Sequence, residues 1–404
     1  MREQTVPAEA EQWITCSLGN IASRITQRNL GDNRNVLTIS ARHGLVSQEG
    51  FFNRQVASAD LSQYFRIERG DFAYNKSYSA GYPAGVVRKL ELYDSGVVSP
   101  LYICFRVDRG LVDPNFLLHY FESGILNDVI LDIAQEGVRN HGLLNVKVED
   151  FFSLKLNIPG LGEQRRVVEI LDEIDSQIAT MRRVIEKRRI VRRHLLRRLV
   201  REGGYGKVPL SEISTIRSGS TPSRARDDYW KSGTVPWVTT SEINYSVITD
   251  TRERVTPVAV TETGLRIFPK GSVLIAMYGE GATRGRCAIL GVDATTNQAA
   301  AAIVPDPASL DSAYLYYSLE DKYEDIRGIG HGSHQTNLNA SMVGGIKIPV
   351  PAVGEQRKIS THLESFDAEL GKEREIEGKY VSLKQALVND LLSGRVRVPV
   401  SAER

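Results

Sequence analysis

The chain repeats itself at an offset of 192 residues, and this repeat restricts the possible folds more than any other feature. Gly162-Glu163-Gln164-Arg165 recurs as Gly354-Glu355-Gln356-Arg357. Weaker matches at similar offsets lie upstream and pair Leu18–Ile21 with Leu210–Ile213, Arg69–Asp71 with Lys270–Ser272, and Leu144-Asn145 with Leu338-Asn339. Chance similarity of two amphipathic helices would not extend into turns and loops. The sequence therefore predicts two copies of one structural unit.

Each copy ends in a segment that predicts a long helix. Residues 162–201 contain no proline, and a heptad seam runs from Leu171 to Leu199, apolar at both ends and charged in the middle. About 40 residues at 1.5 Å each predict a rod of roughly 60 Å. The second copy carries the same kind of seam from Leu363 to Leu391, and Ser393-Gly394 predicts where it ends.

The two helical segments carry opposite charges. Residues 182–201 hold ten Arg and Lys against one Glu, whereas residues 364–377 hold six acids against two bases. If the helices pack antiparallel, Arg188–Arg192 lies level with Glu373–Glu377, and the charges set pairing and orientation. The arginine-rich run also suits a solvated or phosphate-contacting face, because ten basic residues exceed what the acidic stretch neutralises.

The segments before the helices predict mixed α/β domains, because short β-rich runs alternate with turn residues. The expected strands are Val36–Ser40, Gly70–Tyr74, Val98–Arg106, Val235–Thr239, Ser272–Met277 and Gln298–Val304, and the expected helices are Asn115–Asn127 and Ser312–Ile326. The expected divisions are 1–158, a helix over 159–203, a second domain over 204–351, a second helix over 352–395, and a tail over 396–404. The fold class is α+β: two mixed α/β domains joined by two long antiparallel helices that form a coiled coil, a circular repeat with pseudo-twofold symmetry.

Loops rich in Gly, Ser, Asn, aromatic and basic residues interrupt the strands of both domains. Such loops suit DNA, because Arg and Lys chelate guanine, Asn and Gln chelate adenine, and Ser, Thr and backbone amides hold phosphates. For any single residue, an ordinary hydrophilic surface loop is the alternative. The candidate DNA-binding residues are Lys76, Ser77, Tyr78, Arg139, Asn140 and His141 in the first domain, and Ser220, Thr221, Arg224, Tyr278, Thr283, Arg284, His334 and Gln335 in the second.

The sequence lacks the motifs of common nucleotide-dependent enzymes. It has no GxxxxGK[ST] phosphate loop, no Asn/Asp-Pro-Pro-Tyr and no GxGxxG turn after a hydrophobic strand, and His331 and His334 have no further ligands nearby. We therefore expect no catalytic residue, no metal and no cofactor. No apolar run approaches the roughly 20 residues of a membrane span. Three distant cysteines, Cys16, Cys104 and Cys287, and a polar N-terminus predict a cytoplasmic protein.

Two variable domains, each followed by a long helix that opens with Pro-x-x-Gly-Glu-Gln-Arg, resemble the DNA-specificity subunit of type I restriction–modification systems. The resemblance rests on Pro159–Asp175 and Pro351–Asp367 with their downstream helices, together with Val304-Pro305, Leu338-Asn339 and Ile348–Pro351. It covers almost the whole chain. Two copies of the motif at one offset make it far more specific than a single copy.

The resemblance implies that each domain is a target recognition domain that reads one half of a split, asymmetric double-stranded DNA sequence, with the coiled coil as the spacer. It further implies two methyltransferase subunits as partners, which supply chemistry with S-adenosylmethionine, and ATP-dependent restriction subunits that can join them. The domains share little sequence, so the half-sites should differ. Two alternatives remain: a self-sufficient methyltransferase or nuclease with a hidden site, and a coiled-coil scaffold of a related defence complex that does not read DNA.

Overall fold

The computed structural model describes the chain from residue 12 to residue 399, except for residues 32, 41–42, 53–59, 79–80, 135–143, 280–281 and 330–336. The chain forms two compact units. The first unit comprises Met1–Met181 with Ile376–Arg404, and the second unit comprises Arg182–Glu375. Each unit contains part of both long helices.

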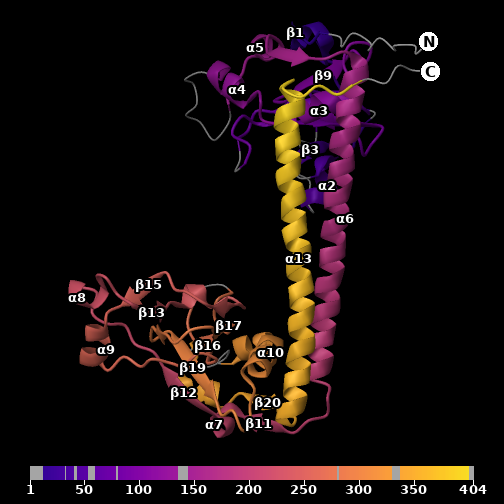
Figure 1. The fold of residues 1–404 in the computed structure, drawn as a ribbon. Coiled ribbons are helices and arrows are strands. Elements are labelled where there is room, and N and C mark those ends of the chain that lie inside the picture. Colours follow the sequence, from indigo (N-terminus) through magenta and orange to yellow (C-terminus); the bar gives the residue numbers. More distant parts are fainter. Residues whose placement is uncertain are drawn as a thin grey trace, which may run out of the picture. The chain divides into compact units, whose positions relative to one another are not determined.

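The two long helices predicted from the sequence are α6 (Leu161–Val200) and α13 (Val353–Leu392), of 40 residues each (Figure 1). Helix α13 stops where the sequence predicts, because Gly394 has a left-handed φ of +75° that favours glycine over other residues. In the first unit, the two helices are linked by Lys384, whose ammonium lies 2.7 Å from the carboxylate of Asp175.

Within the second unit, the C-terminal half of α6 lies antiparallel to the N-terminal half of α13. Arg188 forms an ion pair with Glu373 at 2.8 Å, and further along α6 the Nη2 atom of Arg192 lies 2.9 Å from Asp367. Later residues of α6 thus contact earlier residues of α13, as expected for antiparallel helices. The predicted alignment of opposite charges in the middle of the seam is confirmed at Arg188 and Glu373.

The first unit is built on an antiparallel sheet in the order β2-β9-β6-β7. Its strands are β2 (Ala22–Arg24), β6 (Phe72–Asn75), β7 (Val86–Lys89) and β9 (Ile103–Val107). Two-stranded pairs join β1 (Ile14–Ser17) to β10 (Lys155–Ile158), β3 (Leu37–Ser40) to β4 (Gly44–Ser47), and β5 (Phe65–Glu68) to β8 (Ser95–Val98). The short helices are α1 (Leu18–Ile21), α2 (Gln48–Phe52), α3 (Pro114–Glu122), α4 (Asn127–Ile133) and α5 (Val148–Phe152). Aromatic rings fill the core, where Tyr74 stacks on Phe151 at 4.7 Å.

The second unit is built on a sheet in the order β12-β19-β16-β17-β14. Its strands are β12 (Ser214–Ser218), β14 (Val247–Ile248), β16 (Val273–Ala276), β17 (Cys287–Leu290) and β19 (Ala300–Pro305). A smaller sheet contains β15 (Glu253–Val255), β13 (Val235–Val238) and β18 (Thr295–Thr296), and β11 (Lys207–Pro209) pairs with β20 (Lys347–Pro349). The short helices are α7 (Leu210–Ile213), α8 (Asp227–Trp230), α9 (Pro257–Thr263), α10 (Ser312–Asp321), α11 (Tyr323–Gly328) and α12 (Ala340–Gly344).

The two units share one internal plan, which extends the sequence repeat to the strands. The order β2-β9-β6-β7 in the first unit corresponds to β12-β19-β16-β17 in the second. Gly70 and Gly271, matched in the sequence, both take a left-handed φ, +94° and +90°, in the turn before β6 and β16. The amides of Leu144 and Leu338, also matched in the sequence, bond to the carbonyls that follow those same strands, at Lys76 and Met277.

The glutamine of each Gly-Glu-Gln-Arg motif joins the start of a long helix to the unit beside it. Gln356 is fully buried; its Oε1 accepts from the Asp311 amide at 2.8 Å, and its Nε2 donates to Ser309 at 2.9 Å and Pro351 at 2.8 Å. Gln164 is equally buried and makes the corresponding bonds to Asp113, Leu111 and Pro159. Asp113 and Asp311 are also the N-caps of α3 and α10. The glutamine thus fixes the start of its long helix to the neighbouring backbone through three hydrogen bonds, and we call this role a structural bracket.

Three expected elements are each divided in the structure. The strand expected over Val98–Arg106 is two strands of different sheets, β8 and β9, because Ser99–Tyr102, which includes Pro100, forms a turn closed by a 3.1 Å backbone hydrogen bond. The helix expected over Asn115–Asn127 is α3 followed by α4, with Gly124 in a left-handed conformation between them. The helix expected over Ser312–Ile326 is α10 followed by α11.

Candidate nucleic-acid interface

In the second unit, three loops leave one edge of the main sheet. The antiparallel register puts Ser218, the end of β12, opposite Ala301, and Ala276, the end of β16, opposite Ala300. The loops that follow β12 and β16 and the loop that precedes β19 therefore lie side by side. Their described residues are 219–226, 277–279, 282–286 and 297–299. This edge gathers six of the residues predicted from the sequence: Ser220, Thr221, Arg224, Tyr278, Thr283 and Arg284.

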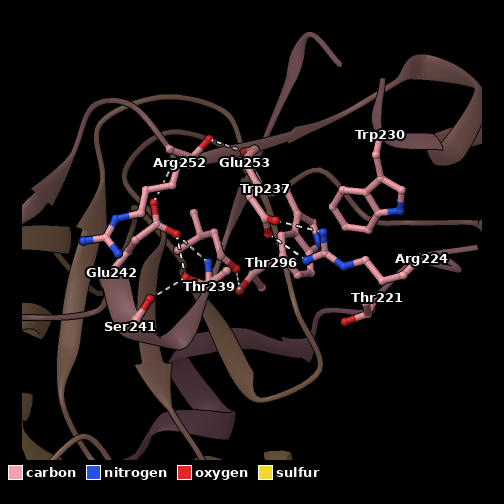
Figure 2. A network of polar contacts seen from close by, with 12 residues as sticks. Thr221, Arg224, Trp230, Trp237, Thr239, Ser241, Glu242, Arg252, Glu253 and Thr296 are labelled. Atoms are coloured by element: carbon pink, nitrogen blue, oxygen red, sulfur yellow. Dashed lines mark hydrogen bonds and ion pairs between the residues drawn. The ribbon is translucent and has the colours of Figure 1, made fainter. Parts of the chain in front are cut away.

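Arg224 is the most strongly organised of these side chains (Figure 2). Its guanidinium lies 3.6 Å from the ring centroid of Trp230 and 5.0 Å from that of Trp237. Its Nη1 and Nη2 atoms donate to the two carboxylate oxygens of Glu253 at 2.8 and 2.7 Å. Among the described residues, nothing bonds to its Nε–H, so one edge of the guanidinium stays open beside exposed Thr221. A stacked, bidentate arginine is already ordered before any ligand arrives.

The ion pair keeps both groups charged. Hydrogen bonds from Arg224 hold the pKa of the Glu253 carboxyl below its usual range, although partial burial opposes the shift. Glu253 in turn raises the pKa of Arg224. A second carboxylate, Glu242, fixes the start of β15: it accepts from the backbone and hydroxyl of Thr239 and, at 2.9 Å, from the Arg252 amide (Figure 2). The backbone that carries Glu253 is therefore fixed independently of Arg224.

The loop that carries Arg224 is anchored to the sheet behind it. The Trp237 indole donates to the Ser220 carbonyl at 3.1 Å, and the Ser220 amide donates to Thr296 at 2.9 Å. Gly219 approaches so closely that a Cβ atom there would lie 1.9 Å from the Thr296 carbonyl oxygen. Only glycine fits at this close approach, so the loop has little freedom to move away from β18.

The remaining residues predicted for the second unit have different environments. Thr221 is exposed and its hydroxyl bonds to Gln298, and Tyr278 is also exposed. Thr283 is half-buried. Arg284 is only 9% exposed and donates to the Arg327 carbonyl, so it ties its loop to α11. His334 and Gln335 lie outside the described residues.

In the first unit, Lys76, Ser77 and Tyr78 follow β6, at the edge that corresponds to the one described above. Lys76 is half-buried, and burial lowers the pKa of its ammonium. The Ser77 amide donates to the Asn75 side chain at 3.1 Å, and the Tyr78 side chain is exposed. Arg139, Asn140 and His141 lie outside the described residues.

Sequence reasoning missed the residues that position Arg224. Glu253, Trp230 and Trp237 come from separate segments and meet only through tertiary folding. A usable signal was present, because two of the three tryptophans, Trp230 and Trp237, follow shortly after the loop that ends in Ser223-Arg224. A tryptophan near an arginine favours stacking of the cation on the indole ring.

A groove of about 1020 Å³ lies within the second unit, between α6, α10, α11 and α13. Acids neutralise part of its basic lining: Arg192 meets Glu320 at 2.7 Å as well as Asp367, and Arg201 pairs with acids of the α10–α11 segment. Arg193 and Arg197 also line the groove, are exposed, and have no ion-pair partner among the described residues. They lie four residues apart, one turn along α6, so the groove presents a row of unneutralised cations.

Within the described part of the chain, no group of three or more His, Cys, Asp and Glu is arranged to hold a metal ion. The same residues contain no helix long and apolar enough to cross a membrane. The three cysteines are free thiols.

Comparison with known proteins finds relatives among the specificity subunits of type I restriction enzymes. Residues 202–378 match the family model of the type I restriction modification DNA specificity domain. The specificity subunit of type I restriction enzyme MjaIX from Methanocaldococcus jannaschii is 36% identical over 179 residues, which are 41% of this chain and 40% of that protein. The EcoR124I/EcoR124II specificity subunit from Escherichia coli is 25% identical over 232 residues, 54% of this chain and 57% of that protein. The chain thus matches about two-fifths of the length of the MjaIX subunit and just over half of the length of the EcoR124I/EcoR124II subunit.

Solved structures share the fold over nearly the full chain. The HsdS subunit from Thermoanaerobacter tengcongensis superposes with a TM-score of 0.52 at 16% identity, covering 98% of this chain and all of the other. The S subunit of a type I restriction–modification system from M. genitalium gives a TM-score of 0.55 at 15% identity, covering 97% and 98%. At these identities the likeness is one of fold, and it confirms the fold class predicted from the sequence.

Proposed function

Because this chain is related to the specificity subunits of type I restriction enzymes and carries their DNA specificity domain over residues 202–378, we propose that it is the sequence-specific DNA-binding subunit of a type I restriction–modification complex. The observation that carries the proposal within the site is the ordered Arg224, stacked on Trp230 and held by Glu253 with one guanidinium edge free. An arginine edge of this kind matches the O6 and N7 acceptors of guanine in the major groove.

Each part of the site has a distinct role in this proposal. Arg224 donates from its free edge to a guanine, and Glu253 acts as a positioning residue that fixes the plane of the guanidinium. Thr221, exposed on the same loop, and Tyr278, exposed on the neighbouring loop, contact the backbone or the flanking base pair. The unneutralised Arg193 and Arg197 contact phosphates, which add affinity without sequence information.

The proposal extends to the complete chain. Each unit reads one half of a bipartite, asymmetric target, and the long helices set the unread spacing between the halves. The chain has no chemistry of its own. It positions two methyltransferase subunits, which modify the DNA, and ATP-dependent restriction subunits join the same complex. Support comes from the shared internal plan of the two units and from their different loop sequences.

The test is selection from random double-stranded DNA by the chain assembled with its methyltransferase partner, carried out for the wild type and for two variants. We expect the wild type to enrich two different short half-sites around a fixed spacer. Arg224→Ala should relax one position of one half-site, a loss of about 1–3 kcal/mol of discrimination. Glu253→Gln should weaken the same position less, because the arginine remains but its plane is no longer fixed.

Arg254→Ala is the matched control. Arg254 lies on β15 next to Glu253, points to the opposite face of the strand, and forms its own ion pair with Asp250. Its removal deletes the same charge from the same strand and should leave the selected sequence unchanged. An unchanged sequence with Arg224→Ala would show that this residue is not a reader. No enrichment by the wild-type complex would refute sequence reading and favour the scaffold.

A further inference from the structure

The shared plan of the two units identifies a loop in the first unit that corresponds to the Arg224 loop. The Arg224 loop follows β12, the outer neighbour of β19. In the first unit, β2 is the outer neighbour of β9 in the same antiparallel sense, and Arg24, the last residue of β2, lies opposite Phe105. The segment after β2 therefore leaves the sheet at the corresponding edge, as does the segment after β6.

The two corresponding loops also share a chemical feature. Arg28 lies over the ring of Phe65, with its guanidinium carbon 4.7 Å from the centroid, and it donates to the Gln63 carbonyl. Arg224 stands over Trp230 in the same way. In each unit, an arginine that follows the outer strand of the sheet is thus stacked on an aromatic ring and held by an oxygen acceptor.

Polar side chains hold the first-unit loop from behind. Asn29 is buried; its side chain donates to the Asn33 carbonyl at 2.9 Å and accepts from the Asn33 amide at 3.3 Å. The Asn33 amide group reaches across to the Ser95 hydroxyl at 2.9 Å. Gly31 has a φ of +90°, a conformation that glycine adopts without strain at the tip of the loop. Residues 29 and 33 are therefore held in place by these bonds.

The front of this loop is open and chemically mixed. Leu30 is 90% exposed, although it is a large apolar residue. Arg34 is exposed and has no ion-pair partner among the described residues. A cavity of about 810 Å³ lies against the loop, and its described lining is Arg28 to Gly31, Asn33, Arg34, Val36 and Asp60 to Gln63. The exposed apolar side chain of Leu30 and the exposed cation of Arg34 line the same cavity, a combination that suits apolar contact and hydrogen bonding with base edges.

We propose that residues 28–31, 33 and 34 are base-reading residues of the first unit, and that they enter a groove of double-stranded DNA with Leu30 foremost. This inference rests on the proposed function. Leu30 supplies an apolar contact to a thymine methyl group or a base step, and Arg34 donates to a neighbouring base edge. Sequence composition favours Lys76 to Tyr78 and Arg139 to His141 instead, and it does not single out the loop after β2.

The experiment compares the assembled complex of wild type, Leu30→Ala/Arg34→Ala and a matched control in selection from random double-stranded DNA. The control is Leu92→Ala/Arg109→Ala. Leu92 is 61% exposed, Arg109 is exposed, and they follow the ends of β7 and β9 that lie at the opposite edge of the same sheet. The loop variant should lose preference at one or two adjacent positions of one half-site, by about 5- to 150-fold each, and the other half-site should persist. The control should match the wild type.

A second measurement separates failure of this inference from failure of the proposed function. Leu30→Cys and Leu92→Cys complexes are tested for disulfide cross-linking to duplex DNA with a thiol tethered to a base. Cross-linking at position 30 and not at position 92 supports entry of the loop into the DNA even if selection enriches no sequence. Equal or absent cross-linking at both positions, or a loop variant that selects the wild-type motif, would overturn the inference.

Discussion

Replacement of Gln356 by methionine tests whether the repeated motif is a structural bracket. Methionine has a similar length and volume, so it fills the site and removes only the amide group. The change leaves the Asp311 amide and the carbonyls of Ser309 and Pro351 without their partner. The side chain of Gln356 is fully buried, so water cannot replace the missing bonds unless the start of α13 moves.

The size of the effect follows from these three bonds. A buried polar group that loses its partner costs about 1–3 kcal/mol, and three such groups would give about 3–9 kcal/mol. Ser309 and Asp311 are half-buried, so the low part of this range applies. Carbonyl oxygens also tolerate a missing partner better than amides do. We expect Gln356→Met to lower the free energy of unfolding by about 3–5 kcal/mol.

The assay is urea unfolding of the full chain at pH 7, followed by circular dichroism. Gln164→Met removes the corresponding bonds in the first unit and should have an effect of similar size. Gln177→Met is the control, because Gln177 is exposed on α6 and its side chain bonds to exposed Glu173 one turn away. It should change stability by less than about 0.5 kcal/mol. A loss below about 1 kcal/mol for Gln356→Met would refute the bracket.

Two further predictions concern charge. Burial alone would raise the pKa of the Glu163 carboxyl, but hydrogen bonds from Arg397 and a backbone amide lower it. The ionised Glu163 therefore stabilises the fold at pH values above its unfolded pKa of about 4.3, and this contribution disappears as the pH falls through the lowered folded value. Arg397→Ala should therefore reduce stability to urea at pH 7, and a difference from wild type that stayed constant down to pH 3 would contradict the assignment. Arg193→Ala/Arg197→Ala should reduce the slope of log K for non-specific DNA binding against log salt concentration by about 0.9 for each phosphate that the protein no longer neutralises. The selected sequence should not change. Arg198→Ala, on the same helix but outside the groove lining, should leave the slope unchanged; an equal change would disprove a phosphate site in the groove.

The features predicted correctly are those that sequence spacing encodes directly. The heptad seams give α6 and α13, because residues three and four apart share one face of a helix. The charge reversal in the seams gives the pairing of Arg188 with Glu373, because antiparallel helices bring the two middles together. The prediction was wrong at Pro100 and Gly124. Composition favoured one continuous strand and one continuous helix there, but a turn at Pro100 and a left-handed conformation at Gly124 divide them.

By itself, the sequence determined that the chain is two copies of one unit, that each copy ends in a long helix, and that the helices pair by opposite charge. These properties depend on periodicity and charge along the chain, which can be recognised in the sequence without the tertiary structure. Only the tertiary structure decided which loops share an edge and which side chains meet there. Contacts with Glu253 and Trp230 order the side chain of Arg224. The loop of Arg28 and Leu30 is identified by comparing the strand order of the first unit with that of the second. Contacts between distant segments depend on sheet register, and a single sequence does not state that register.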